Sequence, residues 1–146
     1  MLKKELYMLI KKQLDENINQ LKNQINSLKK SRNTDTKSSM GDKYETSREM
    51  IQIEINKLEK RLFDAQQKRY VFASLNMDKP HKKIKTGSLI ETNNGRFFIS
   101  VGLGKIQKEN LFAISPSSPI GRVFIDKKKG DVFSFQEREY VITDVF

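Results

Sequence analysis

Two long apolar repeats with the period of a coiled coil constrain this chain more than any other feature. In each repeat, five residues follow one another at alternating steps of four and three. They are Leu14, Ile18, Leu21, Ile25 and Leu28 in the first repeat, and Ile51, Ile55, Leu58, Leu62 and Ala65 in the second. A 3.5-residue apolar period is typical of a narrow seam between helices. Both segments are therefore predicted to be long helices that pair through this seam.

The two repeats fit each other as the arms of an antiparallel hairpin. In such a hairpin the numbers of facing residues have a constant sum. The pairs from Leu28 with Ile51 to Tyr7 with Phe72 all give 79 or 80. The turn is then expected at residues 39–40, and a loop of this length allows antiparallel pairing. A coiled coil between separate chains is the main alternative.

The segment between the repeats, residues 33–46, is the predicted tip of the hairpin. It is rich in Ser, Thr and Asn, which suits a loop. Thr46 with Glu49 has the spacing of a capping box for the second helix, and Asp42 with Glu45 offers a similar one a turn earlier. Carboxylates near a helix N-terminus also interact favourably with the helix dipole, so capping is a sufficient role for both. If the helix has begun by Asp42, a spacing of three puts both carboxylates on one face.

The composition changes near Pro80. Residues 1–83 carry a local charge of +8 with a single Gly, whereas residues 84–146 carry +2 and contain six of the seven Gly and seven of the nine Phe. Long polar segments with few breakers are typical of helices, and short apolar runs between Gly and Pro are typical of strands. The sequence thus predicts a helical hairpin over residues 1–75, a linker over 76–83 that contains a solvated His81, and a small domain over 84–146.

The last part is predicted to be a small α+β domain with five strands and one helix. Asn93-Asn94-Gly95 between two apolar runs is a strong hairpin signal. A short helix is expected over Ser117–Ile125, with Ser117 or Ser118 as its cap and Pro119 in its first turn. The expected strands are residues 88–91, 96–101, 111–115, 132–135 and 140–146.

Several kinds of chemistry are excluded by composition. The chain has no Cys, which excludes disulfides, thiol catalysis and thiolate metal sites, and its single histidine excludes a paired-histidine metal site. No run approaches the roughly 18 apolar residues of a membrane span, and no signal peptide is recognised at the N-terminus. Gly102-Leu103-Gly104-Lys105 lacks the full spacing of a phosphate-binding loop. These features fit a reducing, cytoplasmic location.

The charge changes sign along the predicted hairpin. Residues 1–32 carry +5 and residues 47–75 carry +2, while residues 33–46 between them carry −1. A negative tip does not favour simple nucleic-acid binding there. The distribution suits a partner that surrounds the positive arms with acidic walls and presents a metal ion to the tip.

Two stretches of the chain resemble a known family. Residues 118–131, Ser-Pro-Ile-Gly-Arg-Val-Phe-Ile-Asp-Lys-Lys-Lys-Gly-Asp, are similar to the C-terminal signature of the bacterial transcript-cleavage factors GreA and GreB. Residues 40–45, Met-Gly-Asp-Lys-Tyr-Glu, resemble the Gly-Asp-x-x-Glu-Asn motif at the hairpin tip of those proteins. The resemblance implies an α+β fold: an N-terminal antiparallel coiled-coil hairpin followed by a small FKBP-like β domain with one short helix.

The resemblance also implies a function and its residues. Such a factor binds RNA polymerase, inserts its coiled coil into the secondary channel and stimulates cleavage of the backtracked RNA 3′ end. Asp42 and Glu45 match the acidic pair that helps to hold a shared Mg²⁺ at the polymerase active site, and Ser118 and Pro119 match a polymerase contact. The chain is then expected to be a monomeric accessory factor, with no tightly bound cofactor and no enzymatic activity of its own.

The chain departs from the family pattern at several positions. Thr46 stands where the family has Asn, Gly121-Arg122-Val123 replaces Ala-Arg-Ala, and Asp126 replaces Gly. Two other functions therefore stay open. One is a secondary-channel regulator that modulates or inhibits transcription without cleavage, and the other is a coiled-coil adaptor or chaperone-like module unrelated to the polymerase.

Overall fold

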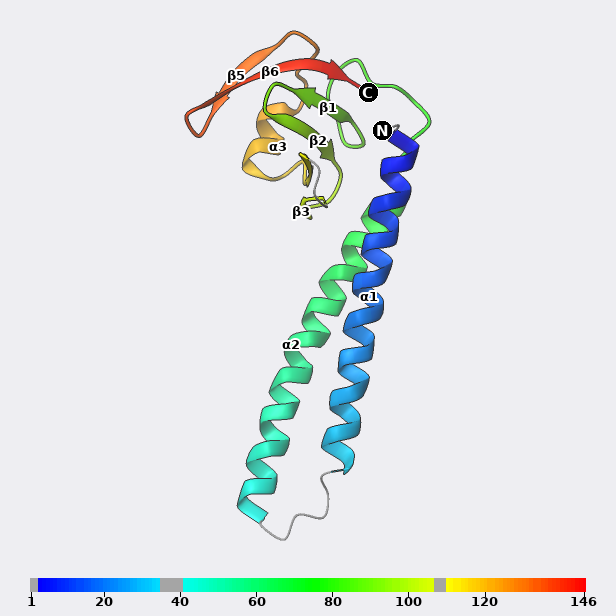
Figure 1. Cartoon of the computed structure of the whole chain (residues 1–146), viewed down its shortest axis with the longest axis vertical. Helices are drawn as coiled ribbons and strands as arrows, with labels where there is room; N and C mark the ends of the chain where they lie inside the picture. Colours follow the sequence, from blue (N-terminus) through cyan, green and yellow to red (C-terminus); the bar gives the residue numbers. More distant parts are fainter. Residues whose placement is uncertain (1–2, 35–40, 107–109) are drawn as a thin grey trace. The chain divides into compact units, whose positions relative to one another are not determined.

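The computed structural model describes residues 3–34, 41–106 and 110–146, except for the side chains of residues 41–44. Two long helices are followed by a mixed sheet and a short helix, which confirms the predicted α+β class (Figure 1). The chain forms two compact units, one of Lys12–Arg69 and one of Met1–Lys11 with Tyr70–Phe146. The predicted domain boundaries after residues 75 and 83 stay predictions.

The unit of Lys12–Arg69 is an antiparallel pair formed by most of α1 (Lys3–Thr34) and α2 (Gly41–Ala73). Its core is the predicted seam: five ladder residues are buried and four more pack against them. The buried ones are Leu21, Ile25, Ile55, Leu58 and Ala65, and the others are Ile18, Leu28, Ile51 and Leu62. The prediction that the two apolar repeats face each other is thereby confirmed.

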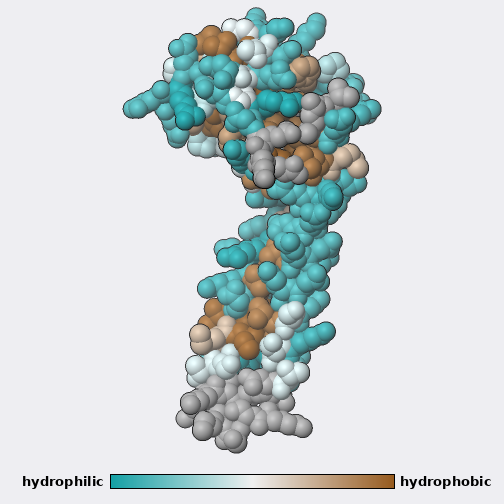
Figure 2. Space-filling model, in the orientation of Figure 1, coloured by the Kyte–Doolittle hydropathy of each residue, from teal (hydrophilic) through white to brown (hydrophobic). Residues whose placement is uncertain are grey.

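Polar side chains also connect the two helices of this unit. Arg69 Nε lies 2.7 Å from Asp15 Oδ1, and Lys29 Nζ lies 3.6 Å from Glu59 Oε1. On the face that Figure 2 shows, hydrophilic side chains border a hydrophobic area on the helical pair. Partly exposed ion pairs of this kind contribute only about 0–1 kcal/mol each. The apolar seam is therefore the main source of stability for this unit.

The helices extend further towards the turn than the sequence predicts. α1 continues to Thr34 and α2 begins at Gly41, so the expected tip segment 33–46 is helical at both of its ends. Thr46 lies inside α2, and the capping box proposed for Thr46 with Glu49 is wrong. The expected centre of the turn at residues 39–40 lies outside the described residues.

The other unit contains a six-stranded sheet in the order β3-β4-β2-β1-β6-β5. Neighbouring strands are antiparallel except β2 and β4, which are parallel. The strands are β1 (Leu89–Thr92), β2 (Gly95–Ile99), β3 (Gly104–Lys105), β4 (Leu111–Ile114), β5 (Val132–Phe135) and β6 (Arg138–Val145).

The prediction of five strands missed β3. This strand has only two residues, Gly104 and Lys105, and both are exposed, so it has no apolar pattern by which to detect it. The predicted hairpin at Asn93-Asn94 is confirmed as the turn between β1 and β2. The short helix α3 (Pro119–Phe124) is also confirmed, with ends slightly inside the predicted ones.

Aromatic rings fill the core of the sheet. Phe124 of α3 is fully buried, and its ring lies 5.0 Å from those of both Phe97 and Phe133. Tyr140 of β6 stacks on Phe133 at 5.1 Å. Such aromatic contacts add roughly 0.5–1.5 kcal/mol each beyond the buried area. The core therefore anchors α3 to the sheet and fixes the segment that precedes this helix.

The same unit includes the two helix ends next to residues 11 and 70. Leu6, Ile10 and Phe72 are fully buried there, and Tyr7 stacks on Phe72 with ring centroids 4.6 Å apart. The predicted facing of Tyr7 and Phe72 is thus confirmed. The Phe72 ring in turn lies 6.3 Å from that of Phe98 in β2. Within the described ranges, neither long helix has a stretch apolar enough to cross a membrane.

Candidate functional site

The first turns of α2 contain the acidic pair singled out by the sequence. Because α2 begins at Gly41, the condition under which Asp42 and Glu45 share one helix face is met by the backbone. The side chain of Glu45 is exposed to solvent, and that of Asp42 lies outside the described side chains. Their assignment as catalytic and metal-binding residues stays a prediction.

A shallow cavity of about 330 Å³ lies beside Glu45. It is lined by Arg32 of α1 and by Glu45, Arg48, Glu49 and Gln52 of α2. Arg32 donates a hydrogen bond from Nη1 to Gln52 Oε1, which ties the end of α1 to α2. Neither arginine was predicted as part of a site from the sequence, although the three-residue spacing of Glu45 and Arg48 on one helix indicates that they share a face.

The donor types here suit Mg²⁺ in part. Mg²⁺ takes oxygen ligands in near-octahedral geometry, and carboxylates are suitable donors. Two carboxylates can supply only part of such a shell, so Asp42 and Glu45 would complete a site that is built mainly by a partner. Among the side chains that the structure describes, no three His, Asp or Glu residues gather closely enough to hold a metal ion.

The second predicted site begins α3. Ser118 is the N-cap of this helix: its Oγ accepts a hydrogen bond from the Gly121 amide at 3.1 Å and donates one to the Ser115 carbonyl at 2.6 Å. Pro119 follows in the first turn, where a missing amide hydrogen costs nothing. Both residues therefore have structural roles, and their contact with a polymerase stays a prediction.

The structure gives a physical reason for one departure from the GreA and GreB pattern and shows why a second is tolerated. A Cβ atom added to Gly121 would lie 2.1 Å from the Ser115 carbonyl oxygen, so the alanine of the family does not fit this conformation. Asp126 has a φ of +69°, in the left-handed region that glycine adopts without cost and that aspartate tolerates. The backbone around α3 is thus adapted to the residues of this chain.

A buried polar pair replaces the solvated linker residue expected at position 81. His81 is 8% exposed and its Nδ1 lies 2.6 Å from the Oγ of Ser88, which is fully buried. The Ser88 hydroxyl also accepts the Lys85 amide at 2.9 Å, so donation to Nδ1 of a neutral imidazole satisfies both groups. The prediction of a solvated His81 is therefore wrong. No sequence pattern indicated this pair.

His81 makes the stability of the protein depend on pH. Burial lowers the pKa of His81 to about 4, with smaller contributions from the charges of Lys3 and Lys85. An unfolded histidine has a pKa near 6.5. The unfolded chain therefore takes up a proton first as the pH falls. Above about pH 6.5, His81 is neutral in both states and its protonation does not affect the free energy of unfolding. Between about pH 6.5 and pH 4, we expect proton uptake by the unfolded chain to lower this free energy by about 2–3 kcal/mol.

Urea unfolding of the wild type and of His81→Gln between pH 7.5 and pH 4.5 tests this expectation. The variant removes the titrating group, so its unfolding free energy should fall less steeply with acidity. If the unfolding free energies of the two proteins change equally with pH, folding does not shift the pKa of His81.

A scan against protein families found no match, and a search of curated proteins found none. Among solved structures, the transcription factor Gfh1 is 16% identical, with 92% of both chains covered and a TM-score of 0.37. GreA factor homolog 1 of Thermus thermophilus is 17% identical, with 97% of this chain and 93% of that chain covered, at the same TM-score. Gfh1 of Thermus aquaticus is 16% identical, with 92% of both chains covered and a TM-score of 0.37. Superpositions this loose do not assign a function.

Proposed function

We propose that this protein is a transcription elongation factor that binds RNA polymerase, inserts its helical pair into the secondary channel and stimulates Mg²⁺-dependent cleavage of backtracked RNA. The observation that carries the proposal is the start of α2 at Gly41, which puts Asp42 and Glu45 in its first turns, next to the end of the hairpin. The two sequence stretches that resemble GreA and GreB support it, because they occur in the family's order on a helical pair followed by a β domain.

The division of labour follows from the chemistry of phosphodiester hydrolysis. A Mg²⁺ ion shared with the polymerase would activate the attacking water and offset charge on the phosphate. Asp42 and Glu45 would supply carboxylate oxygens and orient that water by accepting its hydrogen bonds. The seam of the hairpin keeps the two helices together as far as Leu28 and Ile51. Ser118 and Pro119 would contact the polymerase through the fixed first turn of α3.

The direct test uses a purified elongation complex that has been made to backtrack. Adding the protein with Mg²⁺ is expected to release short RNA fragments from the 3′ end, detected on a denaturing gel. Binding of the protein to the complex without any fragment release would reject cleavage and favour the second candidate function below.

The second candidate is a channel regulator that does not stimulate cleavage. The cavity beside Glu45 favours it, because Arg32 and Arg48 also line this space. Two guanidinium groups next to a carboxylate reduce its attraction for a cation. In this case the protein slows or redirects transcription, and Asp42→Asn leaves that effect unchanged.

Failure to co-purify with core polymerase at moderate salt would instead support an adaptor or chaperone-like role unrelated to transcription.

We expect polymerase binding to weaken with salt, because the two arms of the hairpin carry +5 and +2. Raising the salt concentration from about 50 to about 300 mM should weaken the affinity about tenfold. Lys22→Gln with Lys57→Gln removes two exposed charges and should make the affinity less sensitive to salt. The control Glu54→Gln removes an exposed acid and should do the opposite. Equal dissociation constants at both salt concentrations, measured by fluorescence anisotropy, would contradict this electrostatic contribution.

A further inference from the structure

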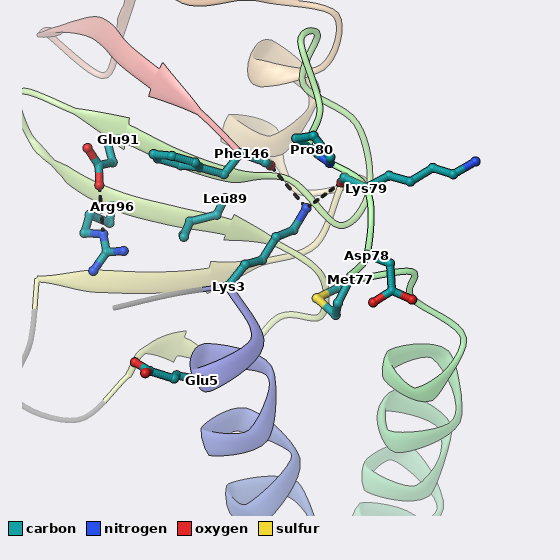
Figure 3. Close-up of a pocket in the computed structure, with 10 residues that line it drawn as sticks. All are labelled: Lys3, Glu5, Met77, Asp78, Lys79, Pro80, Leu89, Glu91, Arg96 and Phe146. Carbon is teal, nitrogen blue, oxygen red and sulfur yellow. Dashed lines mark hydrogen bonds and ion pairs between the residues drawn. The ribbon is translucent and has the colours of Figure 1, made fainter.

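A cavity of about 470 Å³ opens within the unit of Met1–Lys11 and Tyr70–Phe146. Three segments of the chain line it: the start of α1, the connection after α2, and the sheet (Figure 3). The residues are Lys3, Glu5, Met77, Asp78, Lys79, Pro80, Leu89, Glu91, Arg96 and Phe146. Its volume is in the range of sites for small organic molecules, about 300–1,000 Å³.

Much of the cavity wall is apolar. Leu89 is almost completely buried, and the side chains of Met77, Pro80 and Phe146 lie around the same space (Figure 3). Phe146 is held by backbone hydrogen bonds in both directions with Leu89, at 2.8 and 3.1 Å. A ligand with an apolar body would cover the accessible surfaces of Met77, Pro80 and Phe146 and gain from their removal from water.

The Lys3 ammonium lies at this apolar space (Figure 3). Lys3 Nζ donates to the backbone oxygens of Lys79 at 3.4 Å and Phe146 at 3.2 Å (Figure 3). An ammonium group has three N–H donors, so a third remains for a ligand. The structure records no ion pair between Lys3 and an Asp or Glu side chain in the ranges that it describes.

Two of the acids that line the cavity have basic partners. Asp78 lies 3.9 Å from Lys4 Nζ, and Glu91 lies 3.7 Å from Arg96 Nε. Their negative charge is therefore offset locally. Glu5 is the third acid in the lining, and in Figure 3 it stands apart from the Lys3 ammonium.

Two further basic groups interact with the Lys3 ammonium. Burial lowers the pKa of both Lys3 and His81; the charge of Lys85 contributes less to the shift of Lys3, and the charges of Lys3 and Lys85 contribute less to that of His81. These smaller contributions record repulsion between basic groups. An anion at the Lys3 ammonium would relieve this repulsion, whereas a cation would increase it.

We propose that this cavity binds a small amphipathic anion, with its apolar body against Met77 and Phe146 and its anionic group on Lys3 Nζ. A carboxylate or sulfonate attached to an aromatic or short aliphatic body has the required chemistry. This site is additional to the proposed function, which uses residues of the hairpin tip and of α3.

Two dyes of similar shape test the charge preference. Anilinonaphthalene sulfonate is an amphipathic anion, and N-phenyl-1-naphthylamine has the same rings without the sulfonate. The protein contains no Trp, so the dye fluorescence can be read without interference from one. We expect saturable binding of one anionic dye molecule, at least about tenfold tighter than binding of the neutral dye, because a charged hydrogen bond is added. Equal affinities for the two dyes would overturn the proposal.

Substitution of Lys3 identifies the anchor. Lys3→Gln keeps a donor for the two backbone oxygens but removes the charge, and should weaken the anionic dye about tenfold while leaving the neutral dye unchanged. The matched control is Lys82→Gln, an exposed lysine that does not line the cavity. Met77→Gln should weaken both dyes, because it makes the wall polar. An equal effect of Lys3→Gln and Lys82→Gln would contradict the assignment.

The NMR signal of the single histidine tests the proposal with the wild-type protein, so the test does not require a variant to fold. The Cε1 proton gives one NMR signal from which the pKa of His81 can be followed. Saturation with the anionic dye should raise this pKa, because the sulfonate offsets the charge of Lys3. The neutral dye should leave the pKa in place. An unchanged pKa in the presence of bound anionic dye would reject Lys3 as the anchor.

Discussion

Replacing Asp42 by Asn and Glu45 by Gln together is expected to abolish stimulated cleavage of backtracked RNA while leaving polymerase binding almost unchanged. The amides keep the size of the side chains but lose the negative charge that attracts a hard cation such as Mg²⁺. Loss of electrostatic groups that act in a transition state typically lowers rates by about 10²–10³. We therefore expect the cleavage rate to fall by at least about a hundredfold.

Rates of fragment release and dissociation constants measured on the same backtracked complex check this prediction. Glu49→Gln is the matched control, because Glu49 is an exposed acid of α2 near the same cavity but lies outside the resembling motif. It should cleave at nearly the wild-type rate. Wild-type cleavage by the double variant would remove both carboxylates from the mechanism, and equal losses in the control would indicate a general effect of charge.

The second large effect is expected from Gly121→Ala. The new Cβ would lie 2.1 Å from the Ser115 carbonyl oxygen and 2.8 Å from Ser118 Oγ. This carbonyl already accepts hydrogen bonds from the amide and the hydroxyl of Ser118, so it cannot move without disturbing the cap of α3. Alanine gains up to about 1 kcal/mol over glycine in a helix, but overpacking of this severity costs more. We expect a net loss of about 2–3 kcal/mol of unfolding free energy.

Urea denaturation of the variant and of Gly102→Ala measures this difference. A Cβ at Gly102 meets nothing within 4 Å, so the control should change the unfolding free energy by less than about 1 kcal/mol. The new Cβ should displace the start of α3, which contains Ser118 and Pro119. Gly121→Ala should therefore also weaken polymerase binding if the proposed contact is correct. Equal unfolding free energies for Gly121→Ala and the control would show that the segment before α3 can move to accommodate the added Cβ.

The helical pair could be predicted almost completely from the sequence because its apolar residues recur at a regular spacing. Each ladder residue repeats the same spacing, so the register follows from the numbering, and the stack of Tyr7 on Phe72 confirms its last layer. The main strands and α3 were predictable for local reasons: the turn at Asn93-Asn94, the cap at Ser118 and the proline that follows it. The ends of the helices at Thr34 and Gly41 were not, since polar residues suit a loop and an exposed helix equally.

Features that depend on contacts distant in sequence could not be predicted. The burial of His81 depends on Ser88 and on the fold of the segment between them, for which no pattern is known. The cavity around Lys3 required three separate segments, whose arrangement no local pattern gives. At the tip, the acidic pair was found through its motif, whereas Arg32 was missed because it lies on the other helix.

The order of strands in the sheet has a consequence for synthesis on the ribosome. β6, the last strand in sequence, lies between β1 and β5 in the interior of the sheet, and Lys3 near the start of the chain donates to Phe146. A growing polypeptide can close its helical pair once residue 69 has emerged, but the unit of Met1–Lys11 and Tyr70–Phe146 joins the start of α1 to segments that are made much later. The first residues of α1 thus lack part of their native partners until β6 has been made, and chaperones can act on the nascent chain in that interval.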